Sequence, residues 1–425
     1  MSLSTVLKRQ WNLWPELKQE FMRLTQWNNV HAIQFPLVSE QKLKIVIVTE
    51  TWPPEINGVA QSLMYLCQGL QKKGHQILLI RPEQSRACTQ FTPQQECLVW
   101  AKSLPKYPNL QFGMPQYTKV RNSIQAFAPD VVHIVTEGPL GLLALQIAKL
   151  DNIPISSGFH SPFQEFSRFF DLAFLVKPIQ HYLRWFHNQT QLTCVPSQDT
   201  AKALRQCGVS CPLAIISRGV DVQRFSPAHR SLTLRQTWGV DEQTSVMLYV
   251  GRLSPEKEID VIIQAYLKAK QDTSQNVQLV IVGDGPDKAR LQKMDSTGQV
   301  IFTGALIGEQ LAQAYASSDV FVFASQVETF GNVVLEAMAS GLPVVAYDYA
   351  CAHQYIEQDV TGWKIPLKQK QLFEQQLQQL PPIEQIRKMG KHAQQCVQHV
   401  GWEHPVQQFE QALQGVVQTF HYGFA

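Results

Sequence analysis

The stretch ETFGNVVLEAMASGLPVVA (residues 328–346) sets the pattern from which the fold is read. It follows the apolar run VFVFAS (320–325), passes through a glycine-containing turn, continues as good helix formers and ends in the apolar run PVVAYD (343–348). Short apolar runs separated by helical stretches are typical of parallel strands that are covered on both faces. The stretch therefore predicts a strand, a helix and a second strand of one parallel sheet.

Similar apolar runs lie on both sides of this stretch. In the C-terminal half they are SVMLYVG (245–251), QLVIVGDG (278–285) and VIFTG (300–304), with helices predicted over 258–270, 309–317 and 331–340. In the N-terminal half they are KIVIVTE (44–50), HQILLIRP (75–82), DVVHIV (130–135), IPISSGF (153–159), QLTCVPS (191–197) and LAIISRGV (213–220). A polar link at about 221–242 separates the two series, which indicates two sheets.

We expect an α/β protein of two facing Rossmann-like, doubly wound parallel-sheet domains with a helical C-terminal tail. The domains are predicted at 41–220 and 221–400, and a final helix at 401–425. A chain of 425 residues, 44% hydrophobic and 17% charged, is long enough for two cores and globular in composition. Ligands of such sheets bind at the carboxyl ends of the strands.

Residues 1–40 form an amphipathic extension, in which Trp11, Trp14 and Phe21 recur at helical spacing among basic residues. Docking on the protein and lying in a bilayer interface both remain open for it. A net charge of +3 gives no reason to expect a nucleic-acid partner. The sequence has no secretory leader pattern, no C-x-x-C pair and no apolar run of membrane-spanning length. We expect a cytoplasmic protein, with peripheral contact to the inner membrane as an option.

Two glutamates and a helix start carry the first chemical signal. The backbone amides of Gly331, Asn332 and Val333 at the start of the predicted helix suit a phosphate. Glu328 would then accept hydrogen bonds from sugar hydroxyls, and Glu336 from a ribose. For an isolated pair of glutamates the alternative would hold, in which Glu328 caps the helix and Glu336 is solvated.

The segment VGRLSPEKEID (250–260) carries two cations, Arg252 and Lys257, in a loop at the end of a strand. Their charges suit a diphosphate leaving group, because they would stabilise the negative charge that develops as a glycosidic bond breaks. An Arg and a Lys on a loop are more often simply solvated. The spacing of the whole segment, considered next, favours a functional role.

Together these motifs resemble the retaining glycosyltransferases of family 4, which have the GT-B fold. The spacing Glu328-x7-Glu336 matches the E-x7-E motif of that family, and residues 250–260 are similar to its G-R-x-x-x-E-K pattern. The resemblance covers about residues 43–400. It implies that Glu328 contacts the donor hexose, Glu336 the ribose, and the backbone from Phe330 to Val333 the sugar and phosphate. It also implies that Arg252 and Lys257 bind the diphosphate.

The resemblance implies further contacts from the N-terminal domain. Gly58, in TETWPPEINGVAQSL (49–63), opens a helix whose amides can approach a diphosphate or an acceptor, although the family commonly has two adjacent glycines here. His160 follows a predicted strand, at the place where the family often has a histidine that contacts the transferring sugar. Glu137 closes a neighbouring strand, where facing the cleft and capping the next helix are both open.

Three weaker candidates complete the predicted site. Gly283 and Asp284 lie in GDGP (283–286), which lacks the rest of a dinucleotide fingerprint and which faces the nucleotide base in the family. Arg218, in SRGVDVQRFSP (217–227), either approaches the donor or forms a salt bridge between the domains.

The resulting hypothesis is the transfer of a hexose, mannose or glucose, from a nucleoside diphosphate sugar to a hydroxyl acceptor with retention. The acceptor is a lipid or a saccharide, because the motifs resemble bacterial enzymes that act on membrane glycolipids. No metal is expected, since the chain contains no D-x-D pair, and no cofactor beyond the sugar nucleotide as co-substrate. The alternatives are a sugar-nucleotide 2-epimerase of the same fold, a catalytically idle sugar-nucleotide-binding protein and, least favoured, a dehydrogenase.

Overall fold

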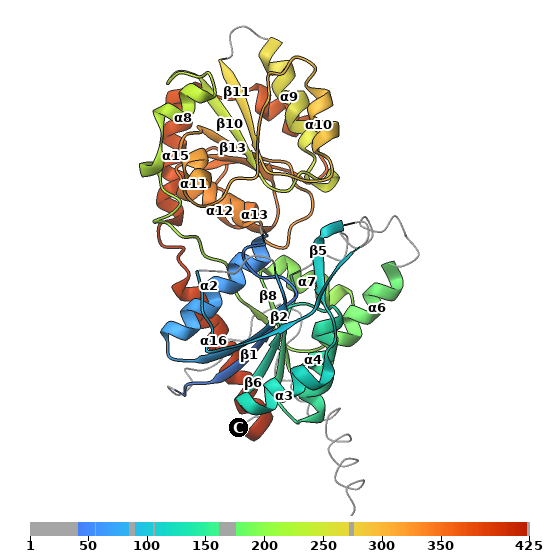
Figure 1. Ribbon diagram of the computed structural model, residues 1–425. Helices are drawn as coiled ribbons and strands as arrows, with labels where there is room; N and C mark the ends of the chain where they lie inside the picture. Colours follow the sequence, from blue (N-terminus) through green and yellow to red (C-terminus); the bar gives the residue numbers. More distant parts are fainter. Residues whose placement is uncertain are drawn as a thin grey trace, which may run out of the picture. The chain divides into compact units, whose positions relative to one another are not determined.

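The computed structural model describes residues 41–55, 57–84, 90–104, 107–160, 176–271 and 276–422. These residues form two parallel sheets, each covered by helices on both faces (Figure 1). The predicted extension over residues 1–40 lies outside the described part of the chain.

The N-terminal lobe, comprising residues 41–215 and the last helix, is built on a seven-stranded sheet with the order β3-β2-β1-β6-β7-β8-β9. Its elements are β1 (Lys44–Val48), α2 (Gly58–Lys72), β2 (Gln76–Pro82), β3 (Gln95–Val99), β4 (Ala101–Leu104), β5 (Tyr107–Gly113), α3 (Tyr117–Phe127), β6 (Val131–Ile134), α4 (Pro139–Leu150), β7 (Ile155–Gly158), α6 (Val176–His187), β8 (Leu192–Val195), α7 (Gln198–Gln206) and β9 (Leu213–Ile215). Strands β4 and β5 form a separate antiparallel pair.

The central strand β1 shows why this sequence forms a buried parallel strand. Ile45 and Ile47 pack into the cluster that contains α2 and α16, whereas Val46 and Val48 pack into the cluster that contains α3 and α4. Successive side chains of a strand point to opposite faces, and both faces are covered here. An uninterrupted apolar run is therefore what this position requires.

The C-terminal lobe, residues 227–397, is built on a six-stranded parallel sheet with the order β12-β11-β10-β13-β14-β15. Its elements are η2 (Pro227–His229), α8 (Leu232–Thr237), β10 (Ser245–Val250), η3 (Pro255–Lys257), α9 (Ile259–Gln271), β11 (Val277–Val282), α10 (Lys288–Met294), β12 (Ile301–Gly304), α11 (Gly308–Ala316), β13 (Val320–Phe323), α12 (Asn332–Ala339), β14 (Val344–Tyr347), α13 (Ala350–Tyr355), β15 (Gly362–Ile365), α14 (Lys370–Gln378) and α15 (Ile383–Val397).

The predicted fold class is confirmed. The prediction missed β3, β15 and the pair β4 and β5, and the first two are explained by their positions. Strands β3 and β15 lie at the outer edges of the two sheets. The sequence of β3, QECLV, begins with two exposed polar residues, and β15, GWKI, has only four residues. An edge strand is paired on one side only and needs no long apolar run, so the criterion of continuous hydrophobicity does not detect it.

The last helix, α16 (Glu403–Tyr422), belongs to the core of the N-terminal lobe rather than to a separate tail (Figure 1). Val406, Phe409 and Leu413 are buried in the same cluster as α2. Glu410 adds a polar contact, because its carboxylate lies 2.9 Å from Nε2 of the buried His75. Nδ1 of His75 accepts a hydrogen bond from the amide of Leu43, so Nε2 carries the proton that binds Glu410.

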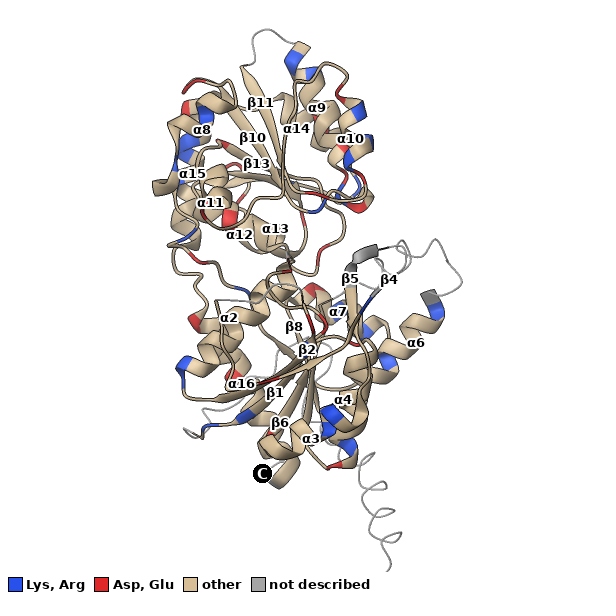
Figure 2. Cartoon of the chain, in the orientation of Figure 1, with Lys and Arg blue, Asp and Glu red and all other residues tan. Residues whose placement is uncertain are grey.

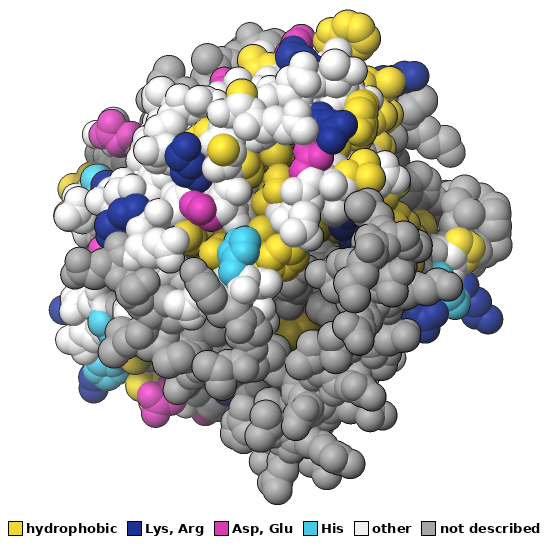
Figure 3. All heavy atoms as spheres, turned by 90° about the horizontal axis from the view of Figure 1, so that it is seen from below, with side chains coloured by type: hydrophobic (Ala, Val, Ile, Leu, Met, Phe, Trp, Pro, Cys, Tyr) yellow, Lys and Arg dark blue, Asp and Glu magenta, His cyan; other side chains and the backbone are white. Residues whose placement is uncertain are grey.

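Charged side chains of both signs are distributed over both lobes. Figure 2 shows Lys and Arg on α6 and on α10, with Asp and Glu interspersed in the connecting loops. The face drawn in Figure 3 mixes cationic, anionic, histidine and hydrophobic side chains among its described residues. No described helix is long and apolar enough to cross a bilayer.

The crossing of α2 and α16 yields a testable prediction about packing. A Cβ added to Gly69 would lie 2.2 Å from Cγ2 of Val406, whereas a Cβ added to Gly58, in the same helix, would meet nothing within 4 Å. We expect Gly69→Ala to lower the free energy of unfolding by about 1–3 kcal/mol through overpacking. Gly58→Ala is the matched control and should not destabilise the protein.

Chemical denaturation measures both variants, and the double variant Gly69→Ala/Val406→Ala tests the cause. If the clash with Val406 is responsible, the double variant loses less stability than the sum of its two single variants. Equal midpoints for Gly69→Ala and the parent protein would show that the two helices do not approach so closely.

Candidate functional site

Lys257 and Glu328 form an ion pair at the carboxyl ends of two neighbouring strands of the C-terminal lobe. Lys257 closes η3 after β10, and Glu328 lies in the loop after β13. The Lys257 ammonium lies 2.6 Å from Oε1 of Glu328 and also donates to Oγ of Ser325 and to the carbonyl of Val327, each at 3.3 Å. The side chains are 10% and 17% exposed, so the pair is held by its surroundings but remains accessible at one edge.

Arg252 lies on the same loop as Lys257 and is more open. Its guanidinium is 3.6 Å from the carboxylate of Glu256, and its side chain is 41% exposed. Glu256 in turn accepts a hydrogen bond of 2.6 Å from the hydroxyl of Ser254. The guanidinium of Arg252 is therefore held near Glu256, while much of the side chain remains exposed to solvent.

The segment from Phe330 to Val333 forms the turn that starts α12. Gly331 precedes the helix with φ of +91°, a left-handed conformation that favours glycine. The ring of Phe330 is 3% exposed and packs in the core, so only its backbone is available to a ligand. Val333 is partly buried against the same core.

Hydrogen bonds connect this turn to the N-terminal lobe. The Asn332 side chain donates to Oγ of Ser62 on α2 at 2.9 Å. The carbonyl of Thr329 accepts from the hydroxyl of Thr200 at 3.2 Å, at the start of α7. The predicted contact segment thus lies beside two helix starts of the other lobe.

Glu336 is neither solvated nor a helix cap. It lies within α12 and accepts a hydrogen bond of 3.0 Å from the hydroxyl of Tyr315, on α11. Burial raises the pKa of Glu336, while the bond from Tyr315 and the charge of Arg224 oppose that shift. The carboxyl group is therefore held in one orientation, as a group that accepts hydrogen bonds from a diol should be.

Gly283 and Asp284 differ in what the structure assigns to them. A Cβ on Gly283 would lie 1.9 Å from the carbonyl oxygen of Gly251, so the glycine is required for two loops to pack together. Asp284 is 61% exposed and lies 3.3 Å from the ammonium of Lys288. Packing explains Gly283 without any ligand, while Asp284 remains accessible.

Gly58 opens α2, as predicted, and its surroundings are empty. The side chain of Asn57 caps the helix by accepting from the amide of Ala60 at 2.7 Å. Gly58 itself is exposed, and a Cβ there would meet nothing within 4 Å. Nothing in the described protein therefore requires glycine at this position for space. A ligand that approaches this backbone is the explanation to test.

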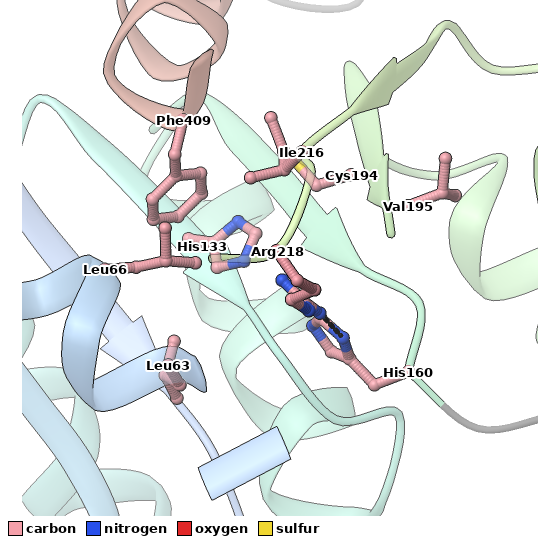
Figure 4. Close-up of a pocket in the computed structure, with 9 residues that line it drawn as sticks. All are labelled: Leu63, Leu66, His133, His160, Cys194, Val195, Ile216, Arg218 and Phe409. Carbon is pink, nitrogen blue, oxygen red and sulfur yellow. Dashed lines mark hydrogen bonds between the residues drawn. The ribbon is translucent and has the colours of Figure 1, made fainter. Parts of the chain in front are cut away.

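His160 and Arg218 meet in a recess of the N-terminal lobe (Figure 4). A nitrogen of the Arg218 guanidinium donates to Nδ1 of His160 at 3.0 Å. The recess is further lined by Leu63, Leu66, His133, Cys194, Val195, Ile216 and Phe409. Arg218 is 5% exposed and has no carboxylate partner among the described residues, so the salt bridge between domains is not observed there.

Glu137 is paired with a histidine that the sequence analysis did not single out. Its carboxylate lies 3.1 Å from Nε2 of the buried His187, the last residue of α6. The helix start that Glu137 could have capped is instead served by Glu50, whose Oε1 accepts from the amide of Leu140 at 3.0 Å. Burial, with a smaller contribution from the charge of Glu137, raises the pKa of Glu50 to about 7.

Most of the predicted residues thus form two groups, while Gly283 and Asp284 lie in the loop after β11, outside both. One group contains Arg252, Lys257, Glu328, Phe330, Gly331, Asn332, Val333 and Glu336, on loops and helix starts of the C-terminal lobe. The other contains Gly58, Glu137, His160 and Arg218, at strand ends and helix starts of the N-terminal lobe. Sequence reasoning missed Ser325, Tyr315, His187, Glu50 and Ser62. Of these, only Glu50 could have been identified from the sequence, because it directly follows the predicted strand KIVIV at the end where ligands bind.

Comparison with known proteins places this arrangement in a family. Residues 56–224 match the family model described as Glycosyltransferase Family 4, and residues 231–395 match Glycosyl transferases group 1. A GDP-mannose-dependent alpha-mannosyltransferase of Mycobacterium tuberculosis is 35% identical over 329 residues, which are 76% of this chain and 84% of the relative. The chain belongs to glycosyltransferase family 4.

Other similar proteins extend the comparison. An alpha-monoglucosyldiacylglycerol synthase of Streptococcus pneumoniae is 25% identical over 75% of this chain and 74% of its own length. Among solved structures, sucrose-phosphate synthase from Thermosynechococcus elongatus matches with a TM-score of 0.72 and 19% identity, covering 88% of this chain and 99% of its own. The Anabaena protein HepE, in complex with UDP-glucose, matches with a TM-score of 0.68 and 21% identity, covering 88% and 100%. The structural matches confirm the GT-B fold.

Gly58 allows a prediction that separates binding from stability. A methyl group at this position finds open space in the protein but would obstruct a ligand that approaches the first turn of α2. We expect Gly58→Ala to weaken substrate binding about tenfold or more, since an intruding carbon costs on the order of 1–3 kcal/mol. Calorimetric titration with sugar nucleotides, and kinetics with varied acceptor, measure the effect.

The control is Lys72→Ala, which removes an exposed side chain at the other end of the same helix. Unchanged dissociation and Michaelis constants in Gly58→Ala would mean that neither substrate approaches this backbone.

Proposed function

We propose that this protein transfers a hexose, mannose or glucose, from a nucleoside diphosphate sugar to a hydroxyl group of a membrane glycolipid or cell-envelope precursor, with retention at the anomeric carbon. The observation that carries the proposal is the group formed by Arg252, Lys257 and Glu328 beside the first turn of α12. It offers cations for a diphosphate, a carboxylate for hydroxyl groups and the backbone amides at the start of α12 for an anion.

The identity of the substrates is supported by the relatives. The mycobacterial relative is named for GDP-mannose, and the pneumococcal relative for a glucosylated diacylglycerol. HepE was solved with UDP-glucose. These names favour a hexose donor and a lipid acceptor for this chain. A lipid acceptor lies in a membrane, so transfer to it would take place at the membrane surface.

The reaction that fits the group is a front-face displacement. The bond from the anomeric carbon to the diphosphate oxygen breaks, and a bond to the acceptor oxygen forms on the same face of the sugar. The acceptor proton passes to an oxygen of the departing diphosphate. Arg252 and Lys257 stabilise the charge on that diphosphate, while Glu328 orients the hexose hydroxyls. Glu336, held by Tyr315, receives the ribose hydroxyls.

The central test is the substitution Glu328→Ala. Lys257 keeps its bonds to Ser325 and Val327, so the protein should still fold with a loss of about 1–3 kcal/mol for the abandoned ammonium. Transfer should fall by about 100-fold or more, because a charge-stabilising and orienting contact is lost at the reacting sugar. Turnover is measured with radiolabelled sugar nucleotides and lipid extracts, below the melting temperature of the variant.

Glu309→Ala is the control, because Glu309 is an exposed glutamate of the same lobe. A thermal-shift screen against GDP, UDP and ADP sugars precedes the assay, since a ligand at 100 times its Kd stabilises by about 2.7 kcal/mol. Full activity of Glu328→Ala would overturn the assignment of the donor site. Release of an epimerised sugar nucleotide without transfer would favour the epimerase.

A second test concerns metal ions. We propose that Arg252 and Lys257 supply the positive charge that a divalent ion would supply in other transferases. Transfer should therefore continue at an unchanged rate in excess EDTA, measured with the same labelled donor, whereas Lys257→Ala should reduce it strongly. Lys293→Ala removes an exposed cation of α10 and is the control. Loss of activity in EDTA, restored by Mg²⁺ or Mn²⁺, would contradict the proposal.

A further inference from the structure

The contact between Arg218 and His160 determines the protonation of the histidine. An arginine remains protonated in proteins and can only donate hydrogen bonds. Because the guanidinium of Arg218 donates to Nδ1 of His160 at 3.0 Å, that nitrogen must carry a lone pair. The single ring proton of the neutral imidazole then belongs to Nε2, whereas an imidazolium would direct an N–H group at the guanidinium.

The surroundings of His160 favour the same neutral form. Burial, followed by the positive charge of Arg218 and by the neighbouring His133 and His187, holds the pKa of His160 well below its usual range. Of these two histidines, His187 has its Nε2 3.1 Å from the carboxylate of Glu137. His133 is itself buried, with its pKa lowered to about 3 and its Nδ1 bonded to Ser156.

The ring of His160 is also restricted on its other side. A Cβ on Gly158, two residues earlier at the end of β7, would lie 2.5 Å from Nε2 of His160. Only a glycine lets the imidazole lie against the strand in this way. Among the described residues Nε2 has no hydrogen-bond partner, and the residue as a whole is only partly buried.

In the described structure, the contact with His160 is the main polar contact that the Arg218 guanidinium makes. Arg218 is buried beside Cys194, Ile216 and Phe409, and no described carboxylate pairs with it. Burying an arginine without a counter-charge costs free energy. A buried cation whose hydrogen bond goes to a histidine is suited to fixing that histidine rather than to holding the lobe together.

We propose that Arg218 is a positioning residue that holds His160 as the neutral Nε2–H tautomer, so that His160 presents a permanent hydrogen-bond donor, and not a general base, to the transferring sugar. This inference rests on the proposed function for its last step. The fixing of the tautomer by Arg218 stands on the structure of the N-terminal lobe alone.

Nitrogen-15 NMR of the full-length protein with labelled histidine tests the proposal directly. In the parent protein, the signals of His160, assigned by their loss in His160→Gln, should show a neutral ring with the proton on Nε2 from about pH 5 to about pH 8. In Arg218→Met the opposing charge and the donor are both removed. Burial, the largest cause of the low pKa of His160, remains in this variant, so the ring should stay neutral but populate both tautomers.

Arg218→Lys provides the conservative variant, because an ammonium can also only donate to Nδ1. It should restore the neutral Nε2–H pattern, and it takes the place of Arg218→Met if the latter does not fold. A pattern in Arg218→Met that is identical to that of the parent protein, or a parent His160 that titrates or carries its proton on Nδ1, would overturn the proposal.

Kinetics connect the tautomer to transfer. Arg218→Met should lower kcat by about 10- to 100-fold, as misplacement of a contact to the reacting sugar does, with a smaller effect on the KM for the acceptor. In the His160→Gln background, where the amide can still donate, the same change should cost less than about threefold, because Arg218 acts through His160. Equal losses in both backgrounds would indicate a merely structural arginine.

The two experiments also separate this inference from the proposed function. The NMR result requires no substrate, so the expected histidine pattern without any detectable transfer would contradict the function while leaving the role of Arg218 in place. If transfer responds to Glu328→Ala but not to Arg218→Met, the proposed function would stand and the role of Arg218 in transfer would be contradicted.

Discussion

Both sheets of this protein are covered on both faces, and that burial confines its chemistry to the ends of the strands. Strand β10 is buried at each of its six positions, and the central strand β1 carries only apolar side chains after its first residue. A polar group within such a strand loses water and needs a partner there, as His133 of β6 has in Ser156 of β7. Polar side chains with a function therefore follow the strands: Glu50, Glu137, His160, Arg218, Arg252 and Glu328 all lie in the segments after β1, β6, β7, β9, β10 and β13.

At these strand ends the groups are partly desolvated, and each is held by a specific neighbour. Lys257 is bonded to Glu328, Glu336 to Tyr315, and Glu50 to the amide of Leu140. An ion pair in this half-buried setting is more strongly oriented than one on the surface, because both partners have given up water for each other. The site therefore meets a ligand with its charges already placed, which is the condition under which electrostatic stabilisation of a developing charge is effective.

The sequence predicted the parts of the site that lie within one continuous segment. Residues 328–336 and 250–260 carry their spacing in a single loop and helix, so the positions of Glu328, Glu336, Arg252 and Lys257 could be identified from the motif. Central strands were equally evident, because burial on two faces leaves an apolar run. What escaped was pairing between distant residues: Lys257 with Glu328, 71 positions apart, and Arg218 with His160, 58 positions apart. A single sequence contains no signal for such contacts, and the return of α16 escaped for the same reason, since the helix α2 that it packs against lies far along the chain.

The environment of Arg218 shows how a connection in the fold reaches the site. The chain passes between the lobes after β9 and again before α16, and these two segments run side by side: the amide of Val220 donates to the carbonyl of Val400 at 2.9 Å. A Cβ on Gly219 would lie 2.5 Å from the carbonyl oxygen of Gly401, so the second segment fixes the backbone directly after Arg218. On its other side Ser217 is bonded to Gln408 of α16 at 2.9 Å through its amide. The guanidinium that fixes His160 is therefore itself placed by the C-terminal helix, and the end of the chain contributes to the site without any of its side chains needing to touch a substrate.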